Sequence, residues 1–400
     1  MIASLGMSMV VPFLPMFIKV LGVTDPNELQ RWSGLVVSGV FITAAIATPF
    51  WGWIGDRVGK KKMVIRAIFG LSLSMFVIGL SANVFQLFLF RLLQGVLSGF
   101  IASALALVSA NTPKERSGFA IGFLATSSAA GTLLGPFAGG FMADSFGYRS
   151  VFFITAGLCF ISGLLILFFV REINPSENHK NDFIQNFKFV TLDRNIKYAM
   201  IALIVSSAGI SMIQPLFALF IEERIGSIKF FATLTGAIFG ISGIFEVIAS
   251  PLWGKRNDRK GYKRNLSYAL IGAGIAYALH IIPYGVWSLI PVRMFLGFCI
   301  GGILPSLYSF INKYTPLERK GTVIGIAAGV TMFGGLIGPL LSGFMAPHTG
   351  INFIFILSGM ILAASAFLVL PLKDVIYSVT EKETKTSDSE YNPLVNEQAK

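Results

Sequence analysis

Long apolar runs recur from one end of the chain to the other, and they limit its fold more than any other feature. Twelve stretches of mostly apolar residues are separated by short polar loops. A helix needs about 20 such residues to cross the hydrocarbon core of a bilayer. Only 13% of the residues are charged, about half of the ~25% usual in soluble domains. The sequence therefore predicts an all-α membrane protein with twelve transmembrane helices.

The runs form two groups of six, divided by a polar central segment. Apolar and polar residues alternate near residues 183–190 of that segment, so it forms either a short interfacial helix or a plain linker. The spans are expected near residues 1–21, 34–54, 64–82, 85–109, 119–142, 150–170, 198–221, 231–254, 266–284, 287–312, 322–346 and 351–371. We expect an N-terminal six-helix bundle over residues 1–170, a cytoplasmic linker over 171–197, a C-terminal six-helix bundle over 198–371, and a disordered cytoplasmic tail over 372–400.

Lysine and arginine mark one side of the membrane. One set of loops, with the central segment and the tail, holds 25 of these residues, whereas the opposite loops hold 5. Loops rich in Lys and Arg stay in the cytoplasm, so both termini are predicted to be cytoplasmic. The net charge of +12 then reflects topology, and no nucleic-acid partner is expected. Met1 opens directly into an apolar run, which favours a start of translation a few residues upstream over a cleaved signal peptide.

No cofactor and no metal are expected. The two cysteines, Cys159 and Cys299, lie inside apolar runs and are interpreted as small hydrophobic residues. The three histidines, His179, His280 and His348, are scattered along the chain without the spacing of metal ligands.

The two groups of six repeat one sequence pattern at an offset of 202–203 residues. Because each group has an even number of helices, the two groups have the same orientation in the membrane. Parallel repeats of this kind are one plan of secondary transporters, with the site near the midplane between the halves. The matching pairs are 49–59 with 251–261, 91–95 with 293–297, 112–116 with 315–319, 135–142 with 338–345, Gly6 with Gly209, and Pro12 with Pro215.

Four motifs make the chain resemble the major facilitator superfamily over essentially its whole length. They are residues 5–15 (LGMSMVVPFLP), 52–61 (GWIGDRVGKK), 91–95 (RLLQG) and 131–140 (GTLLGPFAGG). The loop motif at 52–61 marks the superfamily. The fifth-helix motif at 131–140 resembles that of its twelve-helix drug:proton antiporter branch, the bacterial multidrug and tetracycline efflux proteins.

This resemblance implies a secondary active transporter of the bacterial inner membrane. It would export small amphipathic compounds in exchange for protons by alternating access, as a monomer in the lipid bilayer. A dedicated exporter of one metabolite, such as a siderophore or a sugar, stays open as the alternative. An enzyme is not expected, since Gly59 and Lys60 lack the rest of a phosphate-binding loop.

A carboxylate near a helix start predicts a conformational latch. Asp56 ends the second expected span on the cytoplasmic side, where the eleventh span begins, and a carboxylate at a helix N-terminus gains roughly 0.3–1 kcal/mol. Asp258 could do the same for the fifth span. The alternative is that this loop only sets topology and caps a turn. The latch candidates are Gly52, Asp56, Arg57, Gly59, Asp258 and Arg259.

Small residues in the fifth and eleventh spans predict a hinge or a tight helix contact. Glycines at i, i+4 and i+8 leave a stripe without side chains, and a proline in the stripe removes a backbone hydrogen bond. Generic small-residue packing is the alternative. The candidates are Gly131, Gly135, Pro136, Gly139, Gly140, Gly338 and Pro339.

Polar residues inside the apolar runs are candidates for proton coupling and substrate binding. For Arg91 the resemblance implies a role in proton transfer, with Gln94 one turn inward; the alternative is snorkelling to the outer interface. Glu246 is the only acidic residue well inside an expected span. It could bind a proton when the site is empty and a cationic or polar drug when ionised; the alternative is a neutral side chain that only packs its helix. Gln214, just before Pro215, is a further substrate-binding candidate.

Overall fold

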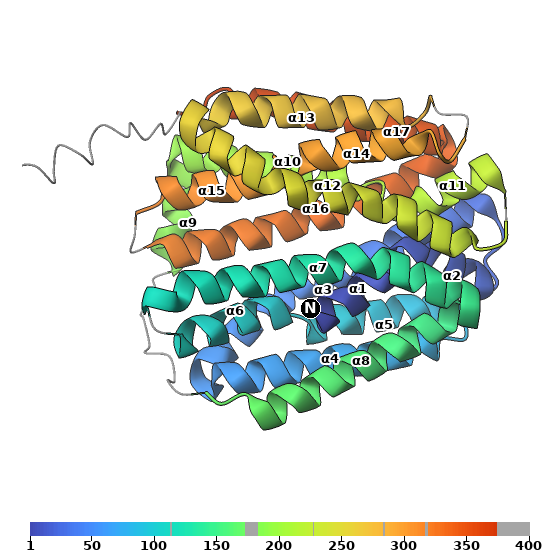
Figure 1. Cartoon of the computed structure of the whole chain (residues 1–400), viewed down its shortest axis with the longest axis horizontal. Helices are drawn as coiled ribbons and strands as arrows, with labels where there is room; N and C mark the ends of the chain where they lie inside the picture. The colour runs from blue at the N-terminus through green and yellow to red at the C-terminus, as the bar shows by residue number, and fades with distance from the viewer. Residues whose placement is uncertain (113, 173–182, 227, 283–284, 317–318, 374–400) are drawn as a thin grey trace, which may run out of the picture.

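The chain folds into helices that run alongside one another (Figure 1). The computed structural model describes residues 1–112, 114–172, 183–226, 228–282, 285–316 and 319–373. The first half contains α1 (Ile2–Val10), η1 (Val11–Phe13), α2 (Leu14–Val20), α3 (Pro26–Val58), α4 (Lys60–Gly79), α5 (Val84–Leu97), α6 (Phe100–Asn111), α7 (Lys114–Phe146) and α8 (Tyr148–Phe169).

The second half repeats this order after one short helix. That helix is α9 (Phe183–Leu192), which lies in the expected linker and packs on α10 and α16. The second half contains α10 (Arg194–Ser211), α11 (Phe217–Ile225), α12 (Phe231–Lys260), α13 (Tyr262–Leu279), α14 (Leu289–Ile300), α15 (Leu304–Tyr314), α16 (Lys320–Thr349) and α17 (Ile351–Val369). The tail predicted to be disordered lies, from residue 374 on, outside the described residues.

The apolar length of the helices makes this a multi-pass membrane protein. Among the described residues, eight helical segments are long and apolar enough to cross a membrane. They cover the expected spans one to three, six, eight, and ten to twelve. The other four expected spans correspond to α5 with α6, α7, α10 with α11, and α13.

Four spans expected to be continuous are interrupted, and the structure corrects them. In the span near 1–21, η1 separates α1 from α2, and in the span near 287–312 a turn over residues 301–303 separates α14 from α15. In the span near 85–109, α5 ends at Leu97 and α6 begins at Phe100, because Gly99 between them adopts a left-handed conformation with φ 104°. The span near 198–221 divides into α10 and α11 at a turn over residues 212–216. Pro215 lies in this turn and has no backbone N–H with which to continue the helix.

Short polar side chains begin several helices. Asp25, Asn83 and Asp193 each accept a hydrogen bond from the backbone N–H three residues further on, at 2.8, 2.9 and 2.9 Å. A cap of this kind stabilises a helix by about 0.5–2 kcal/mol. These residues therefore fix where α3, α5 and α10 start.

The two halves pack in the same pattern. Within the first half α1 packs on α7, α3 on α5, and α4 on α8; within the second α10 packs on α16, α12 on α14, and α13 on α17. Across the halves α3 packs on α16 and α7 on α12. Figure 1 shows α1–α8 as the lower layer and α10–α17 as the upper layer.

Equivalent hydrogen bonds show the repeat at atomic detail. The indole N–H groups of Trp51 and Trp253 each donate to a backbone carbonyl 45 residues further on, at 2.7 and 2.8 Å. The hydroxyls of Ser8 and Ser211 each donate to a carbonyl 123 residues further on, both at 3.2 Å. The internal repeat read from the sequence is therefore also a repeat of helix contacts.

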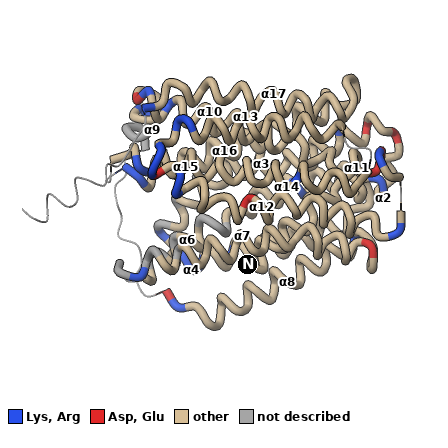
Figure 2. The backbone as a smooth tube through the Cα atoms, turned by 45° about the horizontal axis from the view of Figure 1, so that its top comes forward, with Lys and Arg blue, Asp and Glu red and all other residues tan. Residues whose placement is uncertain are grey.

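Charge separates the two ends of the molecule. Lys and Arg gather at the end where α3 and α12 finish and α4, α13 and α16 begin, which we call the basic end (Figure 2). We call the other end, with α2, α11 and the start of α12, the opposite end. Met1 lies between the two (Figure 1), so the described chain does not bring its first residue to the basic end.

Candidate functional site

A cavity of about 630 Å³ lies between α7 and the second half. Pockets for drug-sized molecules measure ~300–1,000 Å³. Among the described residues that line it, α7 is the only helix of the first half; the others belong to α10, the 212–216 turn and α12 to α15. Its polar lining side chains include Ser128, Thr132, Gln214, Glu246, Tyr277 and Arg293.

Glu246 supplies the acidic group of this cavity. It lies on α12, where its backbone carbonyl accepts a hydrogen bond from the Ser250 hydroxyl at 2.8 Å. Close packing on α14 fixes this turn, because a Cβ built on Gly301 would lie 2.6 Å from the Glu246 carbonyl oxygen. Within the part of the chain that is described, the Glu246 carboxylate has no hydrogen-bond or ion-pair partner. It is therefore available to a proton or to a cationic ligand.

Arg293 lines the same cavity and donates hydrogen bonds to groups of its own half. Its Nε donates to the carbonyl of Ile238 at 3.2 Å, and one terminal nitrogen donates to the carbonyl of Phe239 and the hydroxyl of Ser242, both at 2.8 Å. The guanidinium also lies 4.5 Å from the centre of the Phe217 ring, within range of a cation–π interaction. These contacts fix the position of the guanidinium in the cavity lining.

Two site residues chosen separately from the sequence meet here. Gln214, in the turn between α10 and α11, lines the cavity together with Glu246. The Tyr277 hydroxyl, from α13, donates to the carbonyl of Ile210 at 3.3 Å. The broken seventh span thus places Gln214 at the cavity wall.

Arg91 and Gln94 form a separate polar pair in the first half. Both are buried, and one Nη of Arg91 donates to Oε1 of Gln94 at 2.6 Å, while its Nε donates to the carbonyl of Val36 at 3.1 Å. Arg91 therefore bonds inside its own half rather than reaching toward an interface. Neither side chain lines the cavity that contains Glu246.

The glycines of α7 face neighbouring backbones closely. A Cβ built on Gly131, Gly135 or Gly139 would lie 2.4, 1.8 or 2.2 Å from an atom of residues 1–9. One built on Gly140 would lie 2.3 Å from the carbonyl oxygen of Ala232, on α12 of the other half. Side chains larger than hydrogen do not fit at these places.

Pro136 of α7 and Pro339 of α16 each lie inside a continuous helix. The Pro136 carbonyl oxygen lies 2.1 Å from a Cβ built on Gly236 of α12, and the Pro339 carbonyl oxygen lies 2.5 Å from one built on Gly34 of α3. Gly338 packs on α10, since its Cβ would lie 2.3 Å from the Ala208 carbonyl oxygen. Each proline thus sits where one half touches the other.

The halves touch most closely toward the opposite end. Lys19 of α2 and Glu222 of α11 form an ion pair at 2.5 Å, and a Cβ built on Gly343 would lie 2.8 Å from Cα of Gly34. Toward the basic end, a Cβ built on Gly254 or Gly325 would meet no described atom within 4 Å. The contacts between halves that the described residues show therefore close the opposite end.

The predicted latch loop is only partly described. Asp56 lies in α3, and the placement of its side chain is outside what the structure describes. Gly59 joins α3 to α4 with φ 105°, Arg57 is exposed in the last turn of α3, and a Cβ built on Gly52 meets nothing within 4 Å among the described atoms. The sequence analysis missed Glu172, whose carboxylate accepts the backbone N–H groups of Lys60 and Lys61 at 2.7 and 3.2 Å.

Asp258, the counterpart of Asp56 in the second half, makes a contact within its own half. The Asp258 carboxylate forms an ion pair with Lys313 of α15, in its own half. Arg259 is exposed next to it. Among the described contacts, Asp258 does not reach α7, toward which the sequence had directed it.

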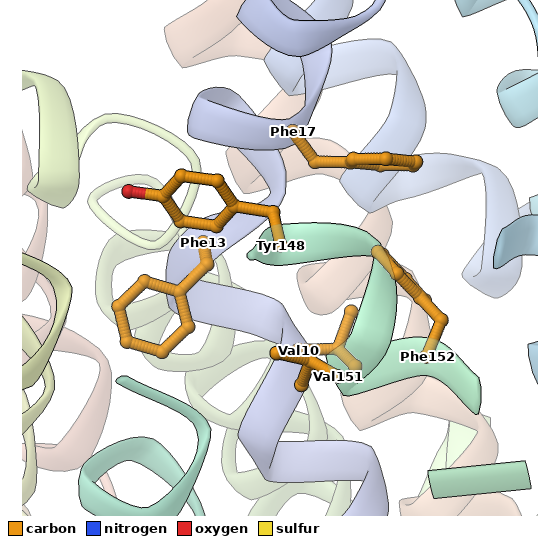
Figure 3. A pocket seen from close by; sticks show the side chains of 6 residues that line it. All are labelled: Val10, Phe13, Phe17, Tyr148, Val151 and Phe152. Atoms are coloured by element: carbon orange, nitrogen blue, oxygen red, sulfur yellow. The ribbon is translucent and has the colours of Figure 1, made fainter. Parts of the chain in front are cut away.

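A second, much smaller pocket of about 10 Å³ is part of the packing. It is lined by Val10, Phe13 and Phe17 on one side and by Tyr148, Val151 and Phe152 of α8 on the other (Figure 3). The rings of Phe17 and Phe152 lie 4.7 Å apart. A volume near 10–15 Å³ holds one water at most, so this pocket is too small for a substrate.

Arg293 and Tyr277 are two of the polar lining residues that the sequence analysis did not select. A signal for Arg293 was present, since it matches Arg91 in the internal repeat. Tyr277 gave none, because a tyrosine in an apolar run usually packs. Among the described residues there is no group of three or more His, Cys, Asp or Glu that could hold a metal ion.

Comparisons with known proteins agree with this architecture. A sequence profile of the Major Facilitator Superfamily matches residues 1–226 and 199–396. The multidrug resistance protein MdtG of Salmonella arizonae is 34% identical over 363 residues, covering 89% of each chain. MdtG of Enterobacter lignolyticus is 33% identical over 368 residues, which is 90% of this chain and 86% of that one.

Solved transporters share the fold. A point mutant of the nucleoside transporter NupG superposes with a TM-score of 0.74 at 16% identity, covering 92% of this chain and 97% of that chain. A bacterial homologue of the human lysosomal transporter Spinster, in an inward-facing and occupied conformation, gives a TM-score of 0.77 at 13% identity, covering 92% and 93%. The resemblance drawn from the motifs is confirmed: the chain belongs to the Major Facilitator Superfamily, in its drug:proton antiporter branch.

Proposed function

We propose that this membrane transporter exports small amphipathic compounds in exchange for protons. The observation that carries the proposal is the Glu246 carboxylate, which has no partner among the described residues and lies in a largely apolar cavity of about 630 Å³. Apolar walls suit the hydrophobic part of such a compound, and Glu246 and Gln214 suit its charged or polar part. The names of the relatives, multidrug resistance proteins, point to the same substrates.

One carboxylate with two competing ligands is enough for exchange. A proton neutralises Glu246 and removes the attraction for a cation, whereas an ionised Glu246 binds the cation. Because the two ligands exclude each other, a proton entering from outside releases the compound, and a compound entering from inside releases the proton.

We place the basic end in the cytoplasm, following the excess of Lys and Arg there. With the opposite end closed, the cavity would then be accessible from the cytoplasm. Residues 1–170 and 198–371 would move as two bundles around it, joined by the linker over 171–197. Asp56 would latch the basic end shut against the start of α16 in the alternative state, where the helix N-terminus attracts its carboxylate.

Transport in proteoliposomes tests the function. We expect a proton gradient to drive accumulation of a fluorescent lipophilic cation by the parent protein, and substrate addition to release protons in a pH-dye assay. Glu246→Gln keeps the shape of the side chain but cannot hold the charge, so both signals should disappear.

Glu28→Gln is the matched control, because Glu28 is an exposed acid near the start of α3, away from the cavity. It should transport like the parent. Proton-coupled transport that persists in Glu246→Gln would refute the proposed site, and transport without any proton movement would refute antiport.

A further inference from the structure

The helix α12 starts without a cap from its own sequence. Its N-cap residue is Phe230, which makes no capping hydrogen bond and has a left-handed backbone with φ 62°. A left-handed conformation is unfavourable for a residue with a bulky side chain. The first N–H groups of a helix also have no partner inside it, so the start of α12 needs a partner from elsewhere.

Asp144 of the other half supplies that partner. One carboxylate oxygen accepts the backbone N–H of Ala232 at 3.1 Å, and the second accepts both the backbone N–H and the hydroxyl of Thr233, each at 2.6 Å. Hydrogen bonds to an ionised acceptor are stronger than neutral ones, and the helix N-terminus adds favourable charge. Asp144, in the last turn of α7, thus caps α12 across the boundary between the halves.

In the first half, the corresponding helix α3 is capped by a residue next to it in the sequence. At the N-cap position of α3 stands Asp25, which accepts the N–H of Glu28 at 2.8 Å within its own half. The position that corresponds to Asp144 at the repeat offset of 203 is Pro347, which has no carboxylate. The repeat has therefore kept a cap for each helix, but only in the second half does the cap cross the boundary.

Other contacts at the opposite end depend on the same closure. The ion pair of Lys19 and Glu222 joins α2 to α11, and the tip of the Phe13 ring lies 3.1 Å from a Cβ built on Gly236 of α12. All of these contacts break if the two halves part at this end. Among these contacts, only the cap brings three hydrogen-bond donors to a single side chain, the Asp144 carboxylate.

We propose that Asp144 is a positioning residue that holds the opposite end closed and is released each time that end opens. The inference rests on the alternating-access part of the proposed function. When the halves part there, α12 loses its cap and Asp144 loses three donors. Removing the carboxylate should therefore favour the state in which the opposite end is open.

Pulsed electron paramagnetic resonance can measure this balance without any substrate. Spin labels would replace Phe85 and Trp287, two exposed residues at the opposite end of different halves, with Cys159 and Cys299 changed to Ala. In Asp144→Asn and Asp144→Ala we expect the ratio of open to closed distances to rise about tenfold, or ~1.4 kcal/mol, as expected for a lost helix cap. Thr233→Val removes one of the three donors and should give a smaller rise.

Asp25→Ala is the matched control, because it removes a cap of the same chemistry from one half only. It should leave the distance distribution unchanged. Each variant is first checked for a single elution peak, and Thr233→Val keeps the test valid if an Asp144 variant does not fold. Distances in Asp144→Ala that equal those of the parent would overturn the inference. Loss of proton coupling would instead appear only in the transport assay, so the two proposals fail separately.

Discussion

The two halves of this transporter share a scaffold but differ in where they keep charge. In the first half, the buried Arg91 donates a hydrogen bond of 2.6 Å to Gln94 on the same helix, so its guanidinium has a polar partner there. In the second half, Arg293 bonds to backbone carbonyls and Ser242, and Glu246 remains without a described partner. The comparison teaches that a duplicated scaffold can keep an acid without a described partner in one copy only, whereas the buried arginine of the other copy bonds to a glutamine.

Moving the acid to the other half gives the strongest test of this comparison. Ala44 occupies the position in α3 that corresponds to Glu246, and it is buried beside Gly95. In the double variant Ala44→Glu, Glu246→Gln, we expect proton-driven uptake in vesicles to stay at least about tenfold below the parent, a difference of ~1.4 kcal/mol. Ala44 is buried and does not line the cavity, so a glutamate introduced there would not take the place of Glu246. Recovery of uptake to near the parent level would mean that the halves are interchangeable.

The two latch loops should respond differently to the same substitution. Asp258 pairs with Lys313 in its own half, and an exposed pair of this kind contributes about 0–1 kcal/mol. We therefore expect Asp258→Asn to lower efflux by less than about fivefold. Asp56→Asn should remove efflux while leaving membrane insertion intact. Drug-efflux rates normalised to protein in the membrane would show this, and equal losses in both variants would contradict the difference between the loops.

Replacing a closely packed glycine by a larger residue should destabilise the protein to a similar extent in both halves. This effect is expected to be smaller than the losses of transport above. A Cβ at Gly135 would lie 1.8 Å from the Ser8 hydroxyl, and one at Gly338 would lie 2.3 Å from the Ser211 hydroxyl. Overpacking typically costs ~1–3 kcal/mol. Gly135→Val and Gly338→Val should lower the apparent Tm in detergent, whereas Gly325→Val, with open space around its Cβ, should not. A Tm for Gly135→Val equal to that of Gly325→Val would show that the stripe is not closely packed.

Much of the fold could be predicted because the relevant signals are local or periodic. Apolar length gave the spans, and the repeat offset paired residues such as Trp51 with Trp253 before their hydrogen bonds were seen. The break at Gly99 escaped prediction because one glycine in an apolar run is compatible with a continuous helix. Its left-handed backbone depends on tertiary packing.

Two residues of the candidate site, Glu246 and Gln214, could be chosen from the sequence and line one cavity, whereas the extent of that cavity could not be predicted. A lone acid in an apolar span identified Glu246, since burying an unpaired carboxylate is costly without a function. The cap of Asp144 on α12 joins residues 88 and 89 positions apart, and no spacing rule predicts it. A carboxylate of one half at a helix N-terminus of the other was predicted for Asp56 at the basic end. Such a contact is observed for Asp144 at the opposite end.

The cavity has one consequence for how such a protein would change under selection. Because α7 is the only first-half helix among its described lining residues, most of the side chains that would contact a compound bound there are encoded by the second half of the gene. Substitutions that alter which compounds are recognised should therefore cluster after residue 198 and within α7. The rest of the first half lies outside this cavity, so two such transporters could differ in the compounds they recognise and still share the first-half helices other than α7.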